Sequence, residues 1–308
     1  MSTESVTSAE TTATGPRRLG VMFDRDRSVR ELPGFCRDLE AAGLDDIWVV
    51  EDLSWAGSIT TAATALAATE RLRVGIGVAP APLRNPALLA MELATLAELY
   101  PGRLVAGIGH GVASWMAQVG AKVTGPLALL SETVSSVRAL LAGERISVEG
   151  SYVQLREVAL THPPAVPPKV VVGAIRPKSL QLAGRVGDGA VLAEGVGPDA
   201  VRAALANVAT GRAEGTAHGP AELVVFTHLV VEPDAAELAR LTEPIRAEFA
   251  TVHGIAPAEV ALAEGSAAQV AERIEALWAA GADTVVLRPV GEEPMATVRR
   301  ALTALGRN

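Results

Sequence analysis

The sequence predicts an α/β fold, a (β/α)8 TIM barrel with insertions after the fourth and seventh strands. Three observations favour it. Eight short apolar runs recur along the 308 residues, a helical pattern follows most of them, and the runs lack strict alternation of apolar and polar side chains. Strands without alternation are buried on both faces, as in a parallel sheet covered by helices. Eight such units in about 250 residues are typical of a closed barrel.

The strands are expected at 19–23, 47–50, 72–78, 104–108, 170–172, 190–193, 223–231 and 284–287. Apolar residues at helical spacing predict helices at 29–42, 58–69, 86–99, 127–141, 177–186, 198–212, 267–280 and 294–305. Prolines in first turns and glycines just past the last turns support these bounds, as at Pro177 and Gly187. Gly184, inside the fifth expected helix, fits its pattern less well.

Two gaps between expected strands are long enough to hold insertions. In the first, residues 145–160 predict a hairpin that turns at Gly150-Ser151. The second, residues 233–265, predicts a helix followed by a loop.

A doubly wound open sheet is the alternative architecture, and it should show a glycine fingerprint for phosphates after an early strand. The nearest match, Gly195-Val196-Gly197, follows the sixth expected strand, where Pro198 explains it as the start of a helix. Neither GxxxxGK[ST] nor GxSxG occurs. The sequence therefore offers no support for a P-loop or for a nucleophile elbow.

The composition excludes several classes of partner. With 27 Lys and Arg against 35 Asp and Glu the net charge is -8, so neither nucleic acid nor an anionic membrane is an expected partner. No apolar run is long enough for a transmembrane helix. Cys36 is the single cysteine and the histidines are widely spaced, so no metal is expected. Residues 1–17 predict a flexible tail, residues 18–308 a single domain, and the whole a cytoplasmic protein.

The candidate site residues are those at strand ends, because barrels of this type build their active face there. Glu51 and Asp52 end the second expected strand, and alternation directs one toward the barrel mouth and the other toward the helices. A catalytic role competes with a structural one, in which one caps the next helix and the other pairs with an arginine. His110, between two glycines, predicts a ligand contact, and a solvent-exposed loop histidine is the alternative.

Gly173, Ala174, Ile175 and Arg176 precede the helix that starts at Pro177. Small residues, a cation and a helix N-terminus together predict a phosphate site, and an ordinary turn is the alternative. The remaining histidines are expected in the core, hydrogen-bonded (His228), or in ordinary loops (His162, His218 and His253).

Two segments are more specific than the barrel pattern. Residues 72–111 contain VGIGVAPAPLRNPALLAMELATLAELYPGRLVAGIGHG, and residues 170–195 are VVVGAIRPKSLQLAGRVGDGAVLAEG. Both resemble the luciferase-like monooxygenase family, and within it the deazaflavin-dependent branch that contains methylenetetrahydromethanopterin reductase. The resemblance covers the chain from Arg18 to its C-terminus.

The resemblance implies a (β/α)8 barrel that binds coenzyme F420, or alternatively FMN, at its C-terminal face. It implies a non-prolyl cis peptide at Gly77-Val78 against the deazaflavin ring, and it places Gly109-His110 beside the cofactor. The turn from Gly173 to Lys178 matches the family's G-A-x-G-P-K turn around the phosphate, with Arg176 in place of a glycine.

Many family members end strand two with an Asp-His pair, where this chain has Glu51-Asp52. The resemblance therefore leaves the acid/base role to Asp52 or to His110. Trp55 resembles the pocket tryptophan of some deazaflavin enzymes, although a packed loop tryptophan explains it nearly as well.

The first hypothesis is an F420-dependent oxidoreductase that moves a hydride between the deazaflavin C5 and a C=C, C=N or C=O carbon of a small organic substrate. An FMN-dependent luciferase-like monooxygenase is the second hypothesis, and a barrel that binds a flavin without turnover is the third. Oxygen consumption separates the first two, because a deazaflavin does not form the usual oxygen adduct. Family members are commonly dimers, so a homodimer is expected.

Overall fold

The computed structural model describes residues 17–215 and 219–307. Eight parallel strands form a closed barrel there, because β8 pairs with β9 and β11 pairs with β1. The predicted (β/α)8 barrel is confirmed. Around the ring the strands are β1 (Arg18–Met22), β2 (Asp46–Val49), β3 (Arg73–Pro80), β4 (Leu104–Gly109), β7 (Lys169–Gly173), β8 (Gly189–Leu192), β9 (Glu222–Val231) and β11 (Thr284–Pro289).

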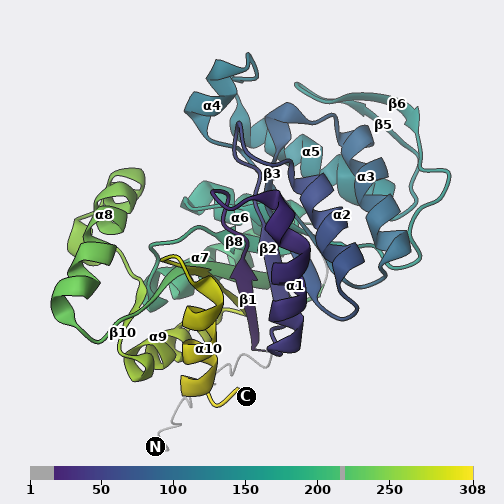
Figure 1. Cartoon of the computed structure of the whole chain (residues 1–308). Helices are drawn as coiled ribbons and strands as arrows, with labels where there is room; N and C mark the ends of the chain where they lie inside the picture. Colours follow the sequence, from purple (N-terminus) through teal and green to yellow (C-terminus); the bar gives the residue numbers. More distant parts are fainter. Residues whose placement is uncertain (1–16, 216–218, 308) are drawn as a thin grey trace, which may run out of the picture.

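A helix follows each barrel strand and packs on its outer face, which removes the apolar residues of both elements from water (Figure 1). The order along the chain explains the pattern, since each strand is followed by a run with helical spacing. The helices are α1 (Leu32–Ala41), α2 (Ser58–Ala68), α3 (Pro86–Leu99), α5 (Pro126–Leu141), α6 (Pro177–Val186), α7 (Pro198–Ala213), α9 (Ala267–Ala279) and α10 (Pro294–Ala304).

Both insertions lie where the sequence predicts them. The first holds the antiparallel hairpin of β5 (Ile146–Glu149) and β6 (Gln154–Val158), with its turn at residues 150–153. The second begins with α8 (Ala235–His253), which lies on the other side of the view from the hairpin in Figure 1.

Five short elements were not predicted as such. The expected loop after α8 contains β10 (Ala263–Gly265), which pairs with β9, and α4 (Ala113–Gln118) precedes α5. The expected first helix begins as a separate 3-10 turn, one of three in the described residues: η1 (Val29–Glu31), η2 (Ala81–Leu83) and η3 (Pro257–Glu259). Elements of three to six residues span too few repeats for periodicity to identify them.

The inside of the barrel is filled by side chains. Trp48 and Phe226 meet edge to face with ring centroids 5.5 Å apart, among apolar side chains from the other strands. The indole fits because Gly75 faces it, and a Cβ at Gly75 would lie 2.3 Å from the ring. A packed interior leaves the two ends of the barrel as the places where polar groups gather.

At the N-terminal end of the barrel, buried charges form a network between strands. Arg73 pairs with Asp46 at 2.6 Å and with Glu222 at 2.7 Å, and Lys169 contacts Glu222 at 2.8 Å. Burial alone would raise the pKa of Glu222, but the nearby Arg73 and Lys169 hold it below its usual value. These residues begin their strands, at the end opposite to the predicted site, where polar groups support stability.

Residues 1–16 of the predicted tail, and His218, lie outside the described residues. Arg17 is described, and its guanidinium donates to Glu275 at 2.7 Å. None of the described helices combines the length and the hydropathy needed to cross a membrane.

Candidate active site

A cavity of about 840 Å3 opens at the C-terminal ends of the barrel strands, where the sequence predicts the site. Strand ends and the loops after them form most of its wall, and residues of α4, α6 and α8 form the rest. Two residues that the sequence or the resemblance suggested for the site do not line it: Lys178, exposed on α6, and Trp55, which lies in the loop after β2. The predicted residues that do are Glu51, Asp52, Gly77, Val78, Gly109, His110, Gly173, Ala174, Ile175 and Arg176.

The floor of the cavity contains the Gly77–Val78 peptide, which is cis, as the resemblance implies. The pairing of β3 with β4 shifts register at this point. The Val78 side chain lies against two glycines of neighbouring strands. A Cβ at Gly109 would lie 2.4 Å from Val78 Cγ2, and one at Gly173 would lie 3.1 Å from Cγ1. Glycine in β4 and β7 is therefore a packing requirement of the Val78 side chain.

The turn between β7 and α6 has the features of an anion site. Arg176 is the N-cap residue and Pro177 begins a ten-residue helix, so the N–H groups of Lys178 and Ser179 have no acceptor within the helix. The Arg176 side chain is exposed, lines the cavity and forms no ion pair with any described residue. Backbone N–H groups, a positive helix end and a free guanidinium together suit a phosphate.

The contacts of Glu51 are those of a helix cap. Its Oε2 accepts from the backbone N–H of Ser58 at 3.0 Å and from the Ser58 hydroxyl, at the first residue of α2. Arg84 donates to the same oxygen at 2.6 Å. This is the structural role that the sequence left open for one of the two adjacent carboxylates.

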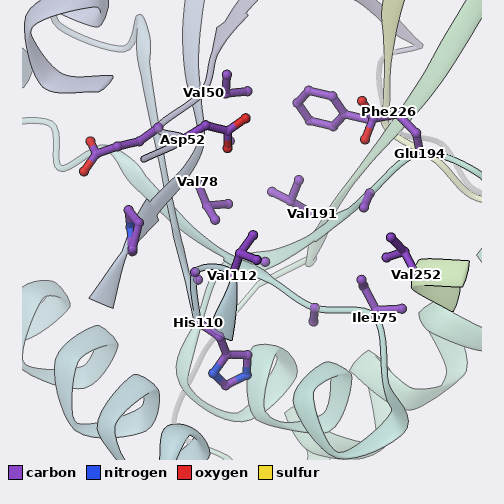
Figure 2. A pocket seen from close by; sticks show the side chains of 18 of the residues that line it. Val50, Asp52, Val78, His110, Val112, Ile175, Val191, Glu194, Phe226 and Val252 are labelled. Carbon is purple, nitrogen blue, oxygen red and sulfur yellow. The ribbon is translucent and has the colours of Figure 1, made fainter. Parts of the chain in front are cut away.

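Asp52 faces the middle of the cavity (Figure 2) and pairs with Arg25, whose Nη1 donates to Oδ2 at 2.6 Å. The Arg25 guanidinium lies 4.6 Å from the ring centroid of Trp55, and the Trp55 indole donates to Asp26 at 3.1 Å. Trp115 of α4 also lines the cavity, and its ring centroid lies 6.3 Å from that of Trp55. The loops after β1 and β2 and helix α4 therefore meet around the Arg25–Asp52 ion pair.

His110 is directed toward α6. Its Nε2 lies 3.4 Å from Ser179 Oγ, and its buried Nδ1 has no hydrogen-bond partner among the described residues. Burial lowers the pKa of His110 below its usual value, so the ring is neutral at pH 7. Figure 2 shows the ring pointing away from Val78 and Asp52. His110 therefore stands beside the anion site of the α6 turn.

On the opposite wall Arg288 of β11 joins two carboxylates. Its Nε donates to Asp24 at 2.8 Å, and its Nη1 donates to Glu194 at 3.3 Å. Burial alone would raise the pKa of Asp24, but Arg288 holds it below its usual value. Burial alone would lower the pKa of Arg288, but Glu194 and Asp24 raise it. Asp24 and Arg288 are consequently charged at neutral pH.

Sequence reasoning missed the α8 wall, which is formed by Glu248, Phe249, Val252 and His253. His253 was expected in an ordinary loop, but its Nε2 donates to the backbone carbonyl of Glu194 at 2.7 Å and ties α8 to the barrel mouth. Phe249 and Val252 are three residues apart, which places them on one face of a helix, and this spacing could have indicated an apolar wall. Arg25 was also missed, inside the charge run 24–27.

His228, near the end of β9, is buried as expected, with 3% of its surface exposed. The expected hydrogen bond is missing at one nitrogen, because Nδ1 has no partner among the described residues. The ring meets Phe249 of α8 edge to face at 5.0 Å. Burial, assisted by the charge of Arg288, lowers the pKa of His228 to about 3.

Residues 6–292 match the model of the luciferase-like monooxygenase family. The chain belongs to this family. An F420-dependent glucose-6-phosphate dehydrogenase of Beutenbergia cavernae is 34% identical over 193 residues, which cover 58% of this chain and 57% of the relative. A 5,10-methylenetetrahydromethanopterin reductase of Methanolobus tindarius is 26% identical over 220 residues, 71% of this chain and 67% of the relative. The chain thus spans less than two thirds of the length of the dehydrogenase.

Solved structures of other proteins share the fold. An F420-dependent secondary alcohol dehydrogenase, in complex with an F420-acetone adduct, has a TM-score of 0.80 and 19% identity, over 94% of this chain and 99% of that one. The oxygenating constituent of 3,6-diketocamphane monooxygenase from Pseudomonas putida, in complex with FMN, has a TM-score of 0.73 and 19% identity, over 94% and 98%. At such identities these likenesses show the barrel alone.

Proposed function

We propose that this protein is an F420-dependent oxidoreductase acting on a small organic substrate. The observation that carries the proposal is the cavity itself, in which the anion site at Arg176 adjoins a floor of Val78 between Gly109 and Gly173. A flat ring with a phosphate-bearing tail fits such a surface, with its phosphate at the α6 turn and its ring over the floor. Relatives named as F420-dependent dehydrogenases support the choice of this cofactor.

When bound, oxidised F420 supplies a hydride acceptor at its C5. We assign the proton to Asp52, because its side chain faces the middle of the cavity (Figure 2) and is held there by Arg25. A carboxylate accepts the hydroxyl proton as an alcohol carbon gives up its hydride and becomes a carbonyl. Arg25, stacked on Trp55, fixes the orientation of the Asp52 carboxylate.

The other two catalytic candidates fit different roles. Glu51 is held at the start of α2 by Ser58 and by Arg84. The His110 ring adjoins Ser179 in the α6 turn, so we assign it to the cofactor's phosphate end. A neutral imidazole N–H in this position donates a hydrogen bond to an anion without adding a charge.

Two substitutions test these roles against each other. Asp52→Asn keeps the shape of the side chain and removes the base, so we expect turnover to fall by about a hundredfold or more with F420 affinity within a few-fold. His110→Ala should weaken F420 binding and leave turnover at saturating cofactor less affected. Turnover is followed as loss of deazaflavin absorbance with simple secondary alcohols. Wild-type turnover in Asp52→Asn, or a large loss in His110→Ala at saturating F420, would contradict the assignment.

An FMN-dependent monooxygenase is the second candidate, because a monooxygenase solved in complex with FMN has a similar barrel fold. The α6 turn binds the phosphate of either cofactor by the same groups. Oxygen uptake with reduced FMN and substrate would favour this candidate. Turnover without oxygen uptake would favour the F420 reaction.

The expected homodimer also remains a proposal, together with the cytoplasmic location. One surface supports a second copy of this chain as the partner. Leu88, Met91 and Leu99 of α3 are each more than half exposed and follow one another at helical spacing. We expect the protein to elute as a dimer in size-exclusion chromatography with light scattering, and Met91→Lys to shift it toward the monomer. A wild-type monomer would contradict the proposal.

A further inference from the structure

The charges of the cavity wall are largely compensated within the protein. Three guanidinium groups and four carboxylates line it among the described residues. Arg25 pairs with a carboxylate at 2.6 Å, and Arg288 lies between Asp24 and Glu194. Only the third guanidinium, that of Arg176, lacks a carboxylate partner among the described residues, and it belongs to the proposed phosphate site of the cofactor.

Arg288 is the cation on the wall away from the α6 turn, and it cannot act as a free positive charge. It is mostly buried, and its pKa is raised by Glu194 and Asp24 against the opposing effect of burial. Two carboxylates on one guanidinium leave this group of three with a net negative charge. Recognition of a phosphate or carboxylate needs a cation whose charge is available to the ligand.

Arg288 nevertheless retains a hydrogen-bond donor. Its Nε and Nη1 donate to Asp24 and Glu194, and its Nη2 donates to no described residue. A guanidinium N–H whose charge is already compensated suits an uncharged oxygen, such as a carbonyl or a hydroxyl.

The wall beside this group carries apolar side chains and one exposed carboxylate, that of Glu248 of α8, but no cation among the residues that the structure describes. Val252 of α8 and Ile175 after β7 line the cavity with 56% and 48% of their surfaces exposed, and Phe249 lies beside Val252 on the same helix. Figure 2 shows Val252 and Ile175 close together, with Glu194 above them in the view. When a ligand covers apolar side chains that converge in a cavity, their removal from water stabilises the complex.

We propose that the α8 side of the cavity binds an uncharged alcohol or ketone with an apolar body, and that Asp24 and Glu194 are specificity residues that exclude anions. This inference rests on the proposed oxidoreductase function. An uncharged oxygen of the substrate accepts from Arg288, and the apolar body lies against Phe249 and Val252. A sugar phosphate, the substrate in the name of the relative from Beutenbergia cavernae, finds no free cation in this part of the cavity.

The test compares two probes that differ by one charge, cyclohexanone and 4-oxocyclohexanecarboxylate. Dissociation constants are measured by ligand-detected NMR with F420-loaded protein and with apoprotein. Wild type should bind the ketone at least about tenfold more tightly than the keto acid. Glu194→Gln should raise affinity for the keto acid about tenfold, or about 1.4 kcal/mol, and change affinity for the ketone by about twofold or less. Asp24→Asn should act in the same direction and serves as the second variant.

Glu214→Gln is the matched control, because it removes a carboxylate paired with Arg185 at 2.7 Å on the surface away from the cavity. It should leave both dissociation constants unchanged. The proposal is overturned if wild type binds the keto acid as tightly as the ketone, if neither probe binds saturably at millimolar concentration, or if both cavity variants keep the wild-type ratio. Failure of F420 to bind would instead refute the proposed function, and the probe ratio in apoprotein is measured independently of it.

Discussion

The buried histidine of β9 makes the stability of the protein depend on pH in a range where carboxylates contribute little. His228 is 3% exposed, and burial together with Arg288 lowers its pKa to about 3. In the unfolded chain the imidazole titrates near its usual pKa of about 6.5. The pKa is lower in the folded protein, so the unfolded chain takes up the proton first as pH falls. The contribution of this histidine to the free energy of unfolding is therefore fully present above pH 6.5 and is lost as pH falls toward 3.

The magnitude follows from the two pKa values. Between pH 7 and pH 5 the unfolded histidine takes up a proton that the folded one does not, which lowers the free energy of unfolding by about 2 kcal/mol at 1.36 kcal/mol per unit. His228→Leu fills the site beside Phe249 with an apolar group that does not titrate. Between pH 7 and pH 5 the free energy of unfolding of the variant should therefore fall by about 2 kcal/mol less than that of wild type.

Urea unfolding at pH 7, 6 and 5, followed by tryptophan fluorescence and by circular dichroism, measures the difference. Each protein is compared with itself across pH, so any change in packing caused by the substitution cancels. His162→Gln, at an exposed loop histidine, is the control and should keep the wild-type slope. Equal pH dependence in wild type and His228→Leu would refute the reasoning, because it would mean that His228 is protonated in the folded protein at pH 5.

Three further outcomes are expected. Gly109→Ala places a Cβ 2.4 Å from Val78 Cγ2 and should weaken F420 binding at least about tenfold in a fluorescence titration, whereas Gly34→Ala, with open space around its Cβ, should not. Arg73→Leu removes the guanidinium that Asp46 and Glu222 share, which leaves Asp46 paired with Arg18 and Glu222 with Lys169, and should lower the free energy of unfolding by about 1.5 to 3 kcal/mol in urea, and a loss under about 1 kcal/mol would contradict this. Cys36 is fully buried and burial raises the pKa of its thiol to about 12, so it should react with a disulfide reagent at pH 8 only after unfolding, and prompt reaction of the folded protein would contradict its burial.

The fold could be predicted because its signals are local. Each barrel strand is a short apolar run and each outer helix has its own periodicity, so the repeated order of the two specifies the barrel. Gly184 was a poor fit to the helix pattern for a reason that sequence does not display. A Cβ there would lie 2.0 Å from the backbone oxygen of Val208, so α6 and α7 approach closely at that position.

The sequence predicts the location of the site better than it predicts the contacts of the site residues. Strand ends identified most of the cavity floor, because topology brings them together at one end of the barrel. The partners of the charged groups come from far along the chain. Arg84 reaches Glu51 across 33 residues, and Arg288 reaches Asp24 across 264. Such pairings depend on which strands become neighbours in the barrel, and no local pattern in one sequence encodes them.

The cofactor is the central claim, and parallel titration of the purified apoprotein with oxidised F420 and with FMN tests it most directly. Binding is followed by fluorescence quenching. We expect saturable binding of F420 at micromolar concentration, weaker or no binding of FMN, and loss of F420 affinity in Arg176→Gln. Preference for FMN would contradict the F420 assignment, and binding of neither would contradict the proposed function as a whole.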